Sequence, residues 1–306
     1  MAPPMEDVHA RAPAPGTVSL RSVGIVGIRK PLVVQRPDRV NSLAVTFRIG
    51  VDLPSARKGS DLSRNAEILA EIVDRSTERP AESLETVCSD IARELLLRHP
   101  YASEATVEAE AEYFLRRGAS ASRRSFEDFT LLAEARAHRG TEGEISVART
   151  VGAEAVGMTA CPCAMESCRS ELEAEFPRLR EPEFARLPIV THNQRNRTRL
   201  LFELAGGPGV EVDAVIDAIE AAQSGPTFAI LKREDEARVV LDAHRRPKFV
   251  EDVLRDLLAS LPARFPQVPD EAIVRASTVS EESIHKYNVE ASHRVALAEL
   301  RREASG

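Results

Sequence analysis

The strongest constraint on the fold is the order in which strand-like and helix-like patterns follow one another along the chain. Val23–Gln35 and Leu43–Leu53 are both β-rich, and the second alternates apolar with polar residues as a half-buried strand does. Two segments with apolar residues at helical spacing come next, and two more strand-like segments follow them. These four segments are Leu62–Val73, Leu84–Leu95, Val107–Tyr113 and Phe126–Ala137. The first half of the chain therefore predicts the order ββααββ.

The same order recurs after the Gly140–Gly143 region, which we take as the boundary between two modules. We predict an α+β fold with one ββααββ module over residues 18–140 and a second over residues 141–306. The segments of the second module are Ile145–Met158, Thr198–Leu204, Val212–Ile219, Val250–Leu257, Ala272–Thr278 and Asn288–Leu297. The last of these fits a helix as well as a strand.

Composition excludes several classes of partner. The 306 residues carry a net charge of −7 without a block of five like charges, so the basic surface that nucleic acid or an anionic membrane requires is not expected. No stretch reaches the roughly 18 consecutive apolar residues of a membrane span. Residues 1–17 contain four prolines and no apolar core of a signal peptide, so we expect a disordered tail and a cytoplasmic protein.

Three of the four cysteines lie within eight positions, at Cys161, Cys163 and Cys168. Thiolates bind Zn²⁺ or Fe²⁺, and a Cys-Pro-Cys sequence without a second cysteine pair favours an open site with mixed ligands over a closed structural zinc site. Two buried cysteines in a turn explain Cys161 and Cys163 equally well. We interpret Cys168 and Cys88 as core residues.

Other polar segments are ambiguous by themselves. His192 lies in the polar run Thr191–Arg195, which fits a metal ligand beside a polar substrate or simply a turn. The run Lys232–Glu236 is typical of a solvated turn, and Glu251 of a helix start, where the helix dipole favours a carboxylate. The sequence Glu282-Ser283-Ile284-His285 pairs an acid with a histidine three residues later. No Gly-x-Ser-x-Gly sequence indicates a serine hydrolase.

Taken together, these motifs resemble the GTP cyclohydrolase IB family, which includes archaeal GTP cyclohydrolases that begin methanopterin synthesis, over roughly residues 20–300. The matching motifs are Val51-Asp52-Leu53-Pro54, Lys58-Gly59 with Ser63-Arg64, Cys161-Pro162-Cys163, His192-Asn193-Gln194-Arg195, Lys232-Arg233 with Asp235-Glu236, Pro247-Lys248-Phe249-Val250-Glu251-Asp252 and Glu282-Ser283-Ile284-His285. The resemblance implies a tandem tunnelling fold, with antiparallel sheets that carry helix pairs on one face. It also implies a homotetramer with active sites at subunit interfaces.

The resemblance further implies roles for individual residues. Cys161, His192 and Glu236 match the ligands of one divalent metal per active site, which we expect to be Fe²⁺, Zn²⁺ or Mn²⁺. Glu251 matches the glutamate that anchors the guanine edge, and Glu282 and His285 match the acid and the histidine of the same pocket, placed to move protons. The cations available for the triphosphate are Lys58, Arg64, Arg195, Lys232 and Lys248.

The implied activity is hydrolytic opening of the guanine imidazole ring of GTP at carbon 8, with release of formate, at an early step of pterin or folate biosynthesis. Two departures from the family pattern concern the product. Asp61 stands where a histidine is usual, and Ala164-Met165 stands where a Ser-Lys pair is common. These departures leave three products open: 7,8-dihydroneopterin triphosphate, its 2′,3′-cyclic phosphate, or a formamidopyrimidine from an incomplete reaction.

Two alternatives remain open at this point. A diverged enzyme of the same fold would stop at a formamidopyrimidine or act on another guanine nucleotide. A protein of another class would bind a pterin, a purine or zinc without catalysis.

Overall fold

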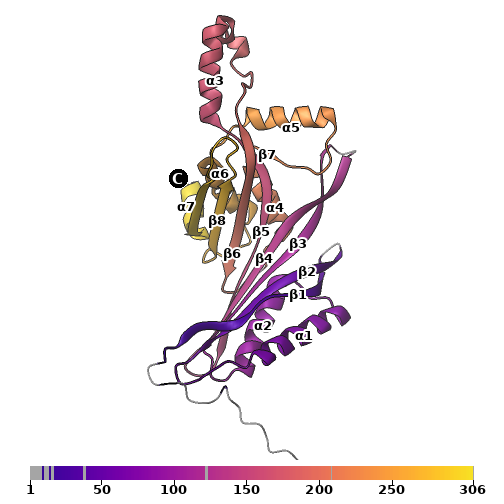
Figure 1. Cartoon of the computed structure of the whole chain (residues 1–306), viewed down its shortest axis with the longest axis vertical. Helices are drawn as coiled ribbons and strands as arrows, with labels where there is room; N and C mark the ends of the chain where they lie inside the picture. Colours follow the sequence, from indigo (N-terminus) through magenta and orange to yellow (C-terminus); the bar gives the residue numbers. More distant parts are fainter. Residues whose placement is uncertain are drawn as a thin grey trace, which may run out of the picture. The chain divides into compact units, whose positions relative to one another are not determined.

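The computed structural model describes residues 9, 14, 17–36, 39–120, 123–207 and 209–305. Most of the predicted disordered tail, residues 1–17, lies outside the described residues. The expected order of elements in the first half is confirmed (Figure 1). These elements are β1 (Leu20–Gln35), β2 (Val40–Leu53), α1 (Leu62–Glu78), α2 (Leu84–Arg98), β3 (Glu104–Ser120) and β4 (Arg123–Arg139).

The second half repeats this order and adds further elements to it. The repeated elements are β5 (Ile145–Ala160), β6 (Asn193–Leu204), α4 (Val212–Ala222), α6 (Val250–Arg264), β8 (Ile273–Ser280) and β9 (Val289–Ala296). The added elements are α3 (Pro162–Glu175), η2 (Pro177–Arg180), η3 (Pro182–Phe184), β7 (Gly225–Pro226), α5 (Arg233–Arg245) and α7 (Leu297–Ser305). The ambiguous last segment is a strand, and a helix begins where it ends.

One sheet contains all the described strands, in the order β1-β2-β3-β4-β5-β6-β8-β9, with the short β7 paired to β5. The strand pairs β1–β2, β2–β3, β5–β7 and β8–β9 are antiparallel, as predicted: Val45 pairs with Ala111 across β2 and β3, and Ala276 with His293 across β8 and β9. The expected module boundary is a tight turn between β4 and β5, where Gly143 has a φ of 88°. A side chain at this φ would be strained, so a glycine is required there.

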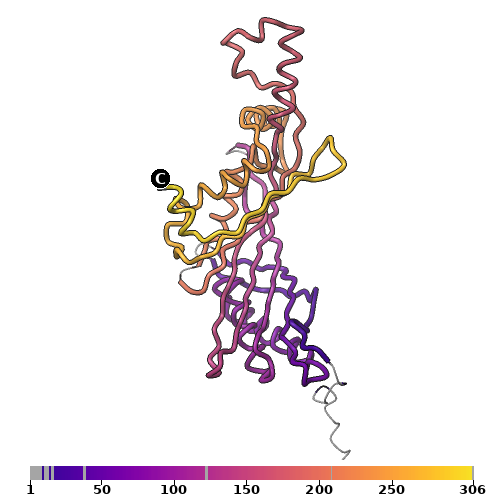
Figure 2. The backbone as a smooth tube through the Cα atoms, turned by 90° about the vertical axis from the view of Figure 1, so that its left-hand side faces the viewer, coloured from indigo at the N-terminus to yellow at the C-terminus, as the bar shows by residue number. Residues whose placement is uncertain are grey.

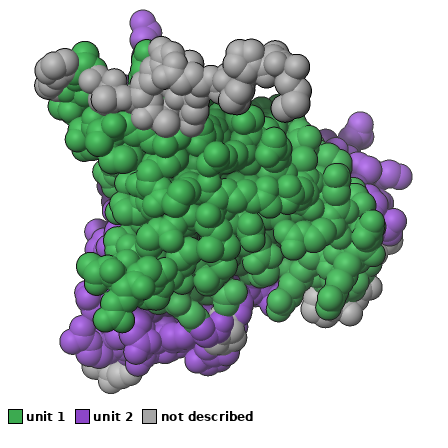
Figure 3. All heavy atoms as spheres, turned by 90° about the horizontal axis from the view of Figure 1, so that it is seen from below, with its two compact units in different colours: residues 1–112, 131–151, 203–206 green, residues 113–130, 152–202, 207–306 purple. Residues whose placement is uncertain are grey.

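The chain forms two compact units, shown in different colours in Figure 3. Unit 1 comprises residues 1–112, 131–151 and 203–206, and unit 2 comprises residues 113–130, 152–202 and 207–306. The four strands β3 to β6 contribute residues to both units. These units group residues by proximity and do not test the predicted sequence modules.

In unit 1, the helices α1 and α2 pack against each other, α1 also against β1 and α2 against β2. Their apolar faces supply Ile68, Leu69, Ile91 and Leu95, all fully buried, as the helical spacing predicts. Cys88 of α2 is fully buried, so its interpretation as a core residue is confirmed, and burial raises the pKa of its thiol well above the usual value.

In unit 2, α4 packs on α6, and α6 in turn contacts β8, β9 and α7. The rings of Phe202 and Phe265 meet in this core with centroids 4.8 Å apart. The strands β8 and β9 form an antiparallel hairpin, yellow in Figure 2. None of the described helices is both long and apolar enough to cross a membrane.

The helix α3 projects from the ends of β5 and β6 and buries none of its residues (Figure 1). Cys168 lies on this helix and is half-buried, so its interpretation as a core residue is wrong. The reason is that, among the described elements, α3 packs chiefly against η2, which covers it only partly.

We expect Ile91→Ala to lower the free energy of unfolding by about 2–5 kcal/mol, because it leaves a cavity between α2 and its neighbours. Leu97→Ala on the same helix is the control: Leu97 is 56% exposed, and its truncation should change stability by less than about 0.5 kcal/mol. Urea unfolding of both variants measures the difference. Equal effects would contradict the assignment of the buried face of α2.

Candidate functional site

The candidate site lies beside the end of β5 and the start of β6, which are neighbouring strands. Cys161 follows the last residue of β5, and His192 precedes the first residue of β6. The Cys161 N–H donates to the His192 carbonyl oxygen over 3.1 Å, and the Thr191 hydroxyl donates to the Cys161 carbonyl oxygen over 2.7 Å. Sheet pairing therefore brings together two residues that are 31 positions apart in sequence, 192 − 161.

Cys161 is the N-cap of α3, and its Sγ accepts a hydrogen bond from the Ala164 N–H over 3.5 Å. Pro162 occupies the first helical position, where its missing N–H costs nothing. Cys161 is half-buried and Cys163 is exposed. The interpretation of this motif as two buried cysteines in a turn is therefore wrong, and both thiols remain accessible to a ligand.

Gln194 links the histidine to the acid. Its Nε2 lies 3.0 Å from Thr159 Oγ1, 3.2 Å from Ser280 Oγ and 3.4 Å from Glu282 Oε1. A carboxylate only accepts hydrogen bonds, so the NH₂ end of the amide must face these oxygens. The Oε1 end then faces His192 Nδ1 at 2.8 Å.

This arrangement determines the tautomer of His192. An amide oxygen only accepts, so His192 Nδ1 carries the hydrogen and the lone pair of the neutral ring is on Nε2. Glu282 Oε2 lies 3.8 Å from the same Nδ1, and the Ser283 hydroxyl lies 3.5 Å from it. His192 therefore has one nitrogen held by the protein and one available for a metal or a proton.

His285 lies in the turn between β8 and β9, and the structure brings it close to His192. The two rings are nearly perpendicular, with centroids 6.3 Å apart, and Tyr287 stacks on His285 with centroids 5.0 Å apart. His285 is exposed, and so are its neighbours Ile284 and Tyr287, at 64% and 62%. His192, Glu282 and His285 thus lie together, and Cys161 adjoins them through its backbone hydrogen bond to His192; we call these four residues the cluster.

The other two predicted acids are exposed and lie on different helices. Glu236 lies in the first turn of α5, and Glu251 is the second residue of α6. Among the described residues, no three His, Cys, Asp or Glu side chains gather closely enough to hold a metal ion. A single chain therefore does not assemble the set Cys161, His192 and Glu236, although Cys161 and His192 lie on adjacent segments.

The predicted phosphate-binding cations of unit 2 differ in availability. Arg195 and Lys232 are exposed. Lys248 is mostly buried, and its Nζ donates to the Ala222 carbonyl oxygen and pairs with Asp256, both over 2.6 Å. Lys248 already has protein partners, so Arg195 and Lys232 are the freer cations.

The remaining two cations belong to unit 1, where Asp61 determines the position of one of them. Asp61 is 9% exposed, and its Oδ2 pairs with Arg57 at 2.9 Å and with Arg64 at 3.1 Å. Arg64 also donates to the Arg98 carbonyl oxygen over 3.0 Å, whereas Lys58 is exposed. The residue that departs from the family pattern therefore immobilises a candidate phosphate ligand.

The segment Lys232–Glu236 is the start of α5, so its interpretation as a solvated turn is wrong. Asp235 is buried, caps the Lys232 N–H and forms an ion pair with Arg123 of β4. The hydrogen bond from Arg123 is the main cause that lowers the pKa of Asp235 below its usual value. This pair anchors the first turn of α5, which carries Glu236.

The role of Gln194 was not predicted. Its sequence signal is the run of polar residues Gln194, Asn196 and Thr198 at every second position of a strand, which places all three on one face. All three are buried, and Asn196 Nδ2 donates to Thr278 Oγ1 of β8 over 2.7 Å. A buried polar face of this kind indicates a hydrogen-bond network.

Comparisons with known proteins agree with the resemblance. A family model described as type I GTP cyclohydrolase folE2 matches residues 5–291. The GTP cyclohydrolase MptA of Methanococcoides burtonii is 39% identical over 97% of this chain and 96% of its own. The GTP cyclohydrolase MptA of Methanosarcina mazei is 38% identical over 98% of each chain.

Solved structures that resemble this one are uricases, at low identity. A uricase from Bacillus fastidious superimposes with a TM-score of 0.51 at 11% identity, over 96% of this chain and 97% of its own. The uricase from Arthrobacter globiformis gives a TM-score of 0.50 at 8% identity, over 90% of this chain and 93% of its own. This likeness concerns the fold alone, and it confirms the predicted tunnelling fold.

We expect Asp235→Asn to destabilise the protein at neutral pH, because Arg123 loses its charged partner. The folded-state pKa of Asp235 is lowered, so its stabilisation is present above the unfolded-state pKa and is lost as the pH falls through the folded-state value. The stability difference between variant and wild type should therefore shrink as the pH falls through the acid range. Urea unfolding as a function of pH measures this.

The matched control for that variant is Glu234→Gln, because Glu234 is an exposed carboxylate in the same helical turn. We expect its stability to follow that of the wild type at every pH. A difference for Asp235→Asn that does not vary with pH would contradict the assigned ion pair.

Proposed function

Because the chain belongs to the family of type I GTP cyclohydrolases and is an enzyme that acts on GTP, we propose that it opens the guanine imidazole ring hydrolytically at carbon 8 and releases formate. The observation that carries this proposal is that Gln194 links His192 to Glu282, while Cys161 bonds to His192 through the backbone and the ring of His285 lies beside that of His192. Family membership removes the alternative of a non-catalytic binding protein. The cytoplasm, where GTP is available, is the proposed location.

We further propose that the enzyme depends on one divalent metal, Fe²⁺, Zn²⁺ or Mn²⁺, held by Cys161, His192 and Glu236. One thiolate, one imidazole and one carboxylate form a donor set that suits these ions, and the free His192 Nε2 supports the assignment. Such a metal lowers the pKa of a bound water from about 15.7 towards about 7. Glu236 as the third ligand remains a prediction from the resemblance.

The chain's own residues would bind the base and move protons. A carboxylate at Glu251 accepts two hydrogen bonds from the N–H edge of guanine, which adenine does not offer in that pattern. A site of this kind rejects analogues that lack the hydrogen-bonding group by about 10⁴-fold or more. Glu282 and His285 lie beside His192, where they can take up and return protons as the ring opens.

The proposed product is 7,8-dihydroneopterin triphosphate or its 2′,3′-cyclic phosphate. The second candidate is a diverged reaction that stops at a formamidopyrimidine or uses another guanine nucleotide. Asp61 is the observation that favours it, since it ties Arg64 to Arg57 and so changes how unit 1 can meet phosphate.

We propose a homotetramer with active sites at subunit interfaces. Two observations support it. The described part of one chain does not gather three metal-ligating side chains, and Ile284 and Tyr287 leave apolar surface exposed beside His285. Apolar groups beside a polar cluster are typical of a surface that another subunit covers.

Anaerobic incubation with GTP of protein loaded with Fe²⁺, Mn²⁺ or Zn²⁺, following formate and product mass together, tests the proposed reaction. Formate with a pterin mass would support it and distinguish linear from cyclic phosphate. Consumption of GTP without a pterin would favour the formamidopyrimidine. No consumption with any metal would contradict metal-dependent ring opening.

We expect Cys161→Ala, His192→Ala and Glu236→Ala each to abolish formate release while circular dichroism shows an intact fold. Each variant removes one proposed metal ligand, so bound metal should fall as well. Cys168→Ala is the control, since it removes a half-buried thiol of the same helix that has no proposed role. Wild-type rates in all three ligand variants would show that the metal assignment is wrong.

We expect Gln194→Leu to lower kcat by about 10–100-fold, the usual cost of losing a group that orients a ligand histidine. Gln194→Glu keeps an acceptor for His192 Nδ1–H and should restore part of the activity. Asn193→Ala, at an exposed neighbouring residue, is the control. The ¹⁵N shifts of His192 should report a mixture of tautomers in Gln194→Leu, and an unchanged Nδ1–H tautomer would contradict the positioning role.

A further inference from the structure

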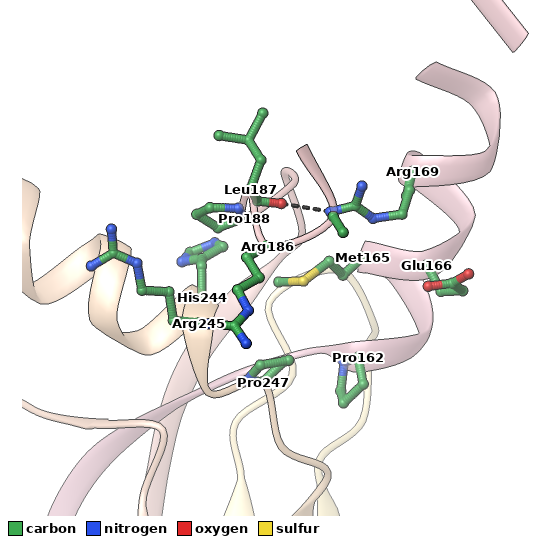
Figure 4. Close-up of a pocket in the computed structure, with 11 residues that line it drawn as sticks. Pro162, Met165, Glu166, Arg169, Arg186, Leu187, Pro188, His244, Arg245 and Pro247 are labelled. Carbon is green, nitrogen blue, oxygen red and sulfur yellow. Dashed lines mark hydrogen bonds between the residues drawn. The ribbon is translucent and has the colours of Figure 1, made fainter. Parts of the chain in front are cut away.

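Unit 2 contains a cavity of about 650 Å³ between the start of α3, residues 185–188 and the end of α5 (Figure 4). None of the residues in the cluster of Cys161, His192, Glu282 and His285 lines it. Its volume is sufficient for a molecule the size of a nucleotide. The cavity is therefore a candidate binding site in addition to the one described above.

A specific contact holds the walls of this cavity together. Arg169 of α3 donates through Nη2 to the Leu187 carbonyl oxygen over 2.6 Å, and its Nη1 lies 3.8 Å from Glu173 Oε1. Arg169 therefore ties the segment that carries Arg186 to the side of α3. Prolines at 162, 188 and 247 restrict the backbone at three points of the lining.

The lining is strongly cationic, although the whole chain is acidic. It contains three arginines, Arg169, Arg186 and Arg245, against a single acid, Glu166. Figure 4 shows the carboxylate of Glu166 turned away from these cations. The net positive charge of this cavity contrasts with the −7 of the chain and favours an anionic ligand.

Arg186 is the residue best placed to hold that ligand. Figure 4 shows its guanidinium inside the cavity, between Met165 and Pro247. Within the described ranges it forms no hydrogen bond or ion pair, whereas Arg169 is engaged by Leu187, and Arg245 pairs with Asp242 at 3.2 Å. An unpaired guanidinium offers two parallel N–H donors, which match the geometry of a phosphoryl group.

We propose that this cavity is a binding site for a phosphate chain, with Arg186 as its central ligand and Arg245 at its edge. The side chain of Met165 provides an apolar surface on which a flat ring attached to the phosphates can pack. The first turn of α3 also lines the cavity and carries no acidic residue, so nothing there repels an anion. Two sources share this chemistry: the triphosphate of GTP itself and a separate phosphorylated effector.

Isothermal titration calorimetry with inorganic tripolyphosphate tests the proposal on the protein as purified. We expect Arg186→Ala to weaken binding at least 10-fold, as the loss of a hydrogen bond to a charged group predicts, and Arg186→Lys to weaken it less. Arg178→Ala is the matched control: Arg178 lies in the same projecting segment, is 79% exposed and pairs with Glu181 outside the cavity. Chelation of metal by tripolyphosphate would affect all variants equally.

An equal affinity of Arg186→Ala and Arg178→Ala for tripolyphosphate would overturn the proposal, as would the absence of binding to the wild type. This outcome is independent of ring opening, so it leaves the proposed function unaffected. Steady-state kinetics then distinguish the sources. Competition between tripolyphosphate and GTP, with a raised KM in Arg186→Ala, identifies the substrate's own phosphates. Inhibition or activation that GTP does not relieve identifies a separate effector.

Discussion

Everything around the candidate site depends on the burial of two side-chain amides within the sheet. Gln194 and Asn196 lie on the buried face of β6, where an unpaired amide N–H is costly, and the NH₂ group of each donates to side chains of the neighbouring strands, although Asn196 Oδ1 has no partner among the described residues. Gln194 finds Thr159 of β5 and Ser280 of β8, and Asn196 finds Thr278 of β8. These hydrogen bonds fix the ends of three strands relative to one another. Cys161 directly follows β5, His192 directly precedes β6 and Glu282 lies two residues beyond β8, so the same bonds position the site.

The network also explains why the amide oxygen of Gln194 is available to accept a hydrogen bond from His192. The amide NH₂ is held by three oxygens, and the amide oxygen is thereby turned towards His192. A hydrophobic residue at this position would pack as well, but it would leave the imidazole free to choose either tautomer. The buried amide of Gln194 thus selects one tautomer of His192, a proposed metal ligand. This agrees with the general role of outer hydrogen bonds at metal-binding histidines.

The sequence predicted the repeated ββααββ order, because alternation and helical spacing follow directly from burial of one face. It did not predict α5, because the charged run Lys232–Glu236 shows no apolar periodicity: its buried residue is Asp235, which is held by Arg123 more than 100 positions earlier. It also missed Gln194, since a polar residue next to a strand entrance looks like part of a turn. Asp235 and Gln194 both take partners that are distant in sequence, so a local pattern such as the polar alternation from Gln194 to Thr198 indicates a buried polar face but not its partners.

The two departures from the family pattern both alter where positive charge is available. Asp61, in unit 1, neutralises and immobilises Arg64, one of the cations that the resemblance offered to the triphosphate. Met165, in unit 2, places an apolar side chain where a lysine is common, yet it lies beside the free guanidinium of Arg186. Arginine binds phosphate through a planar pair of N–H donors, whereas lysine acts as a point charge. Arg186 would therefore hold a phosphate in a fixed orientation. An enzyme that forms either the linear triphosphate or the 2′,3′-cyclic phosphate, and not both, would require such an orientation.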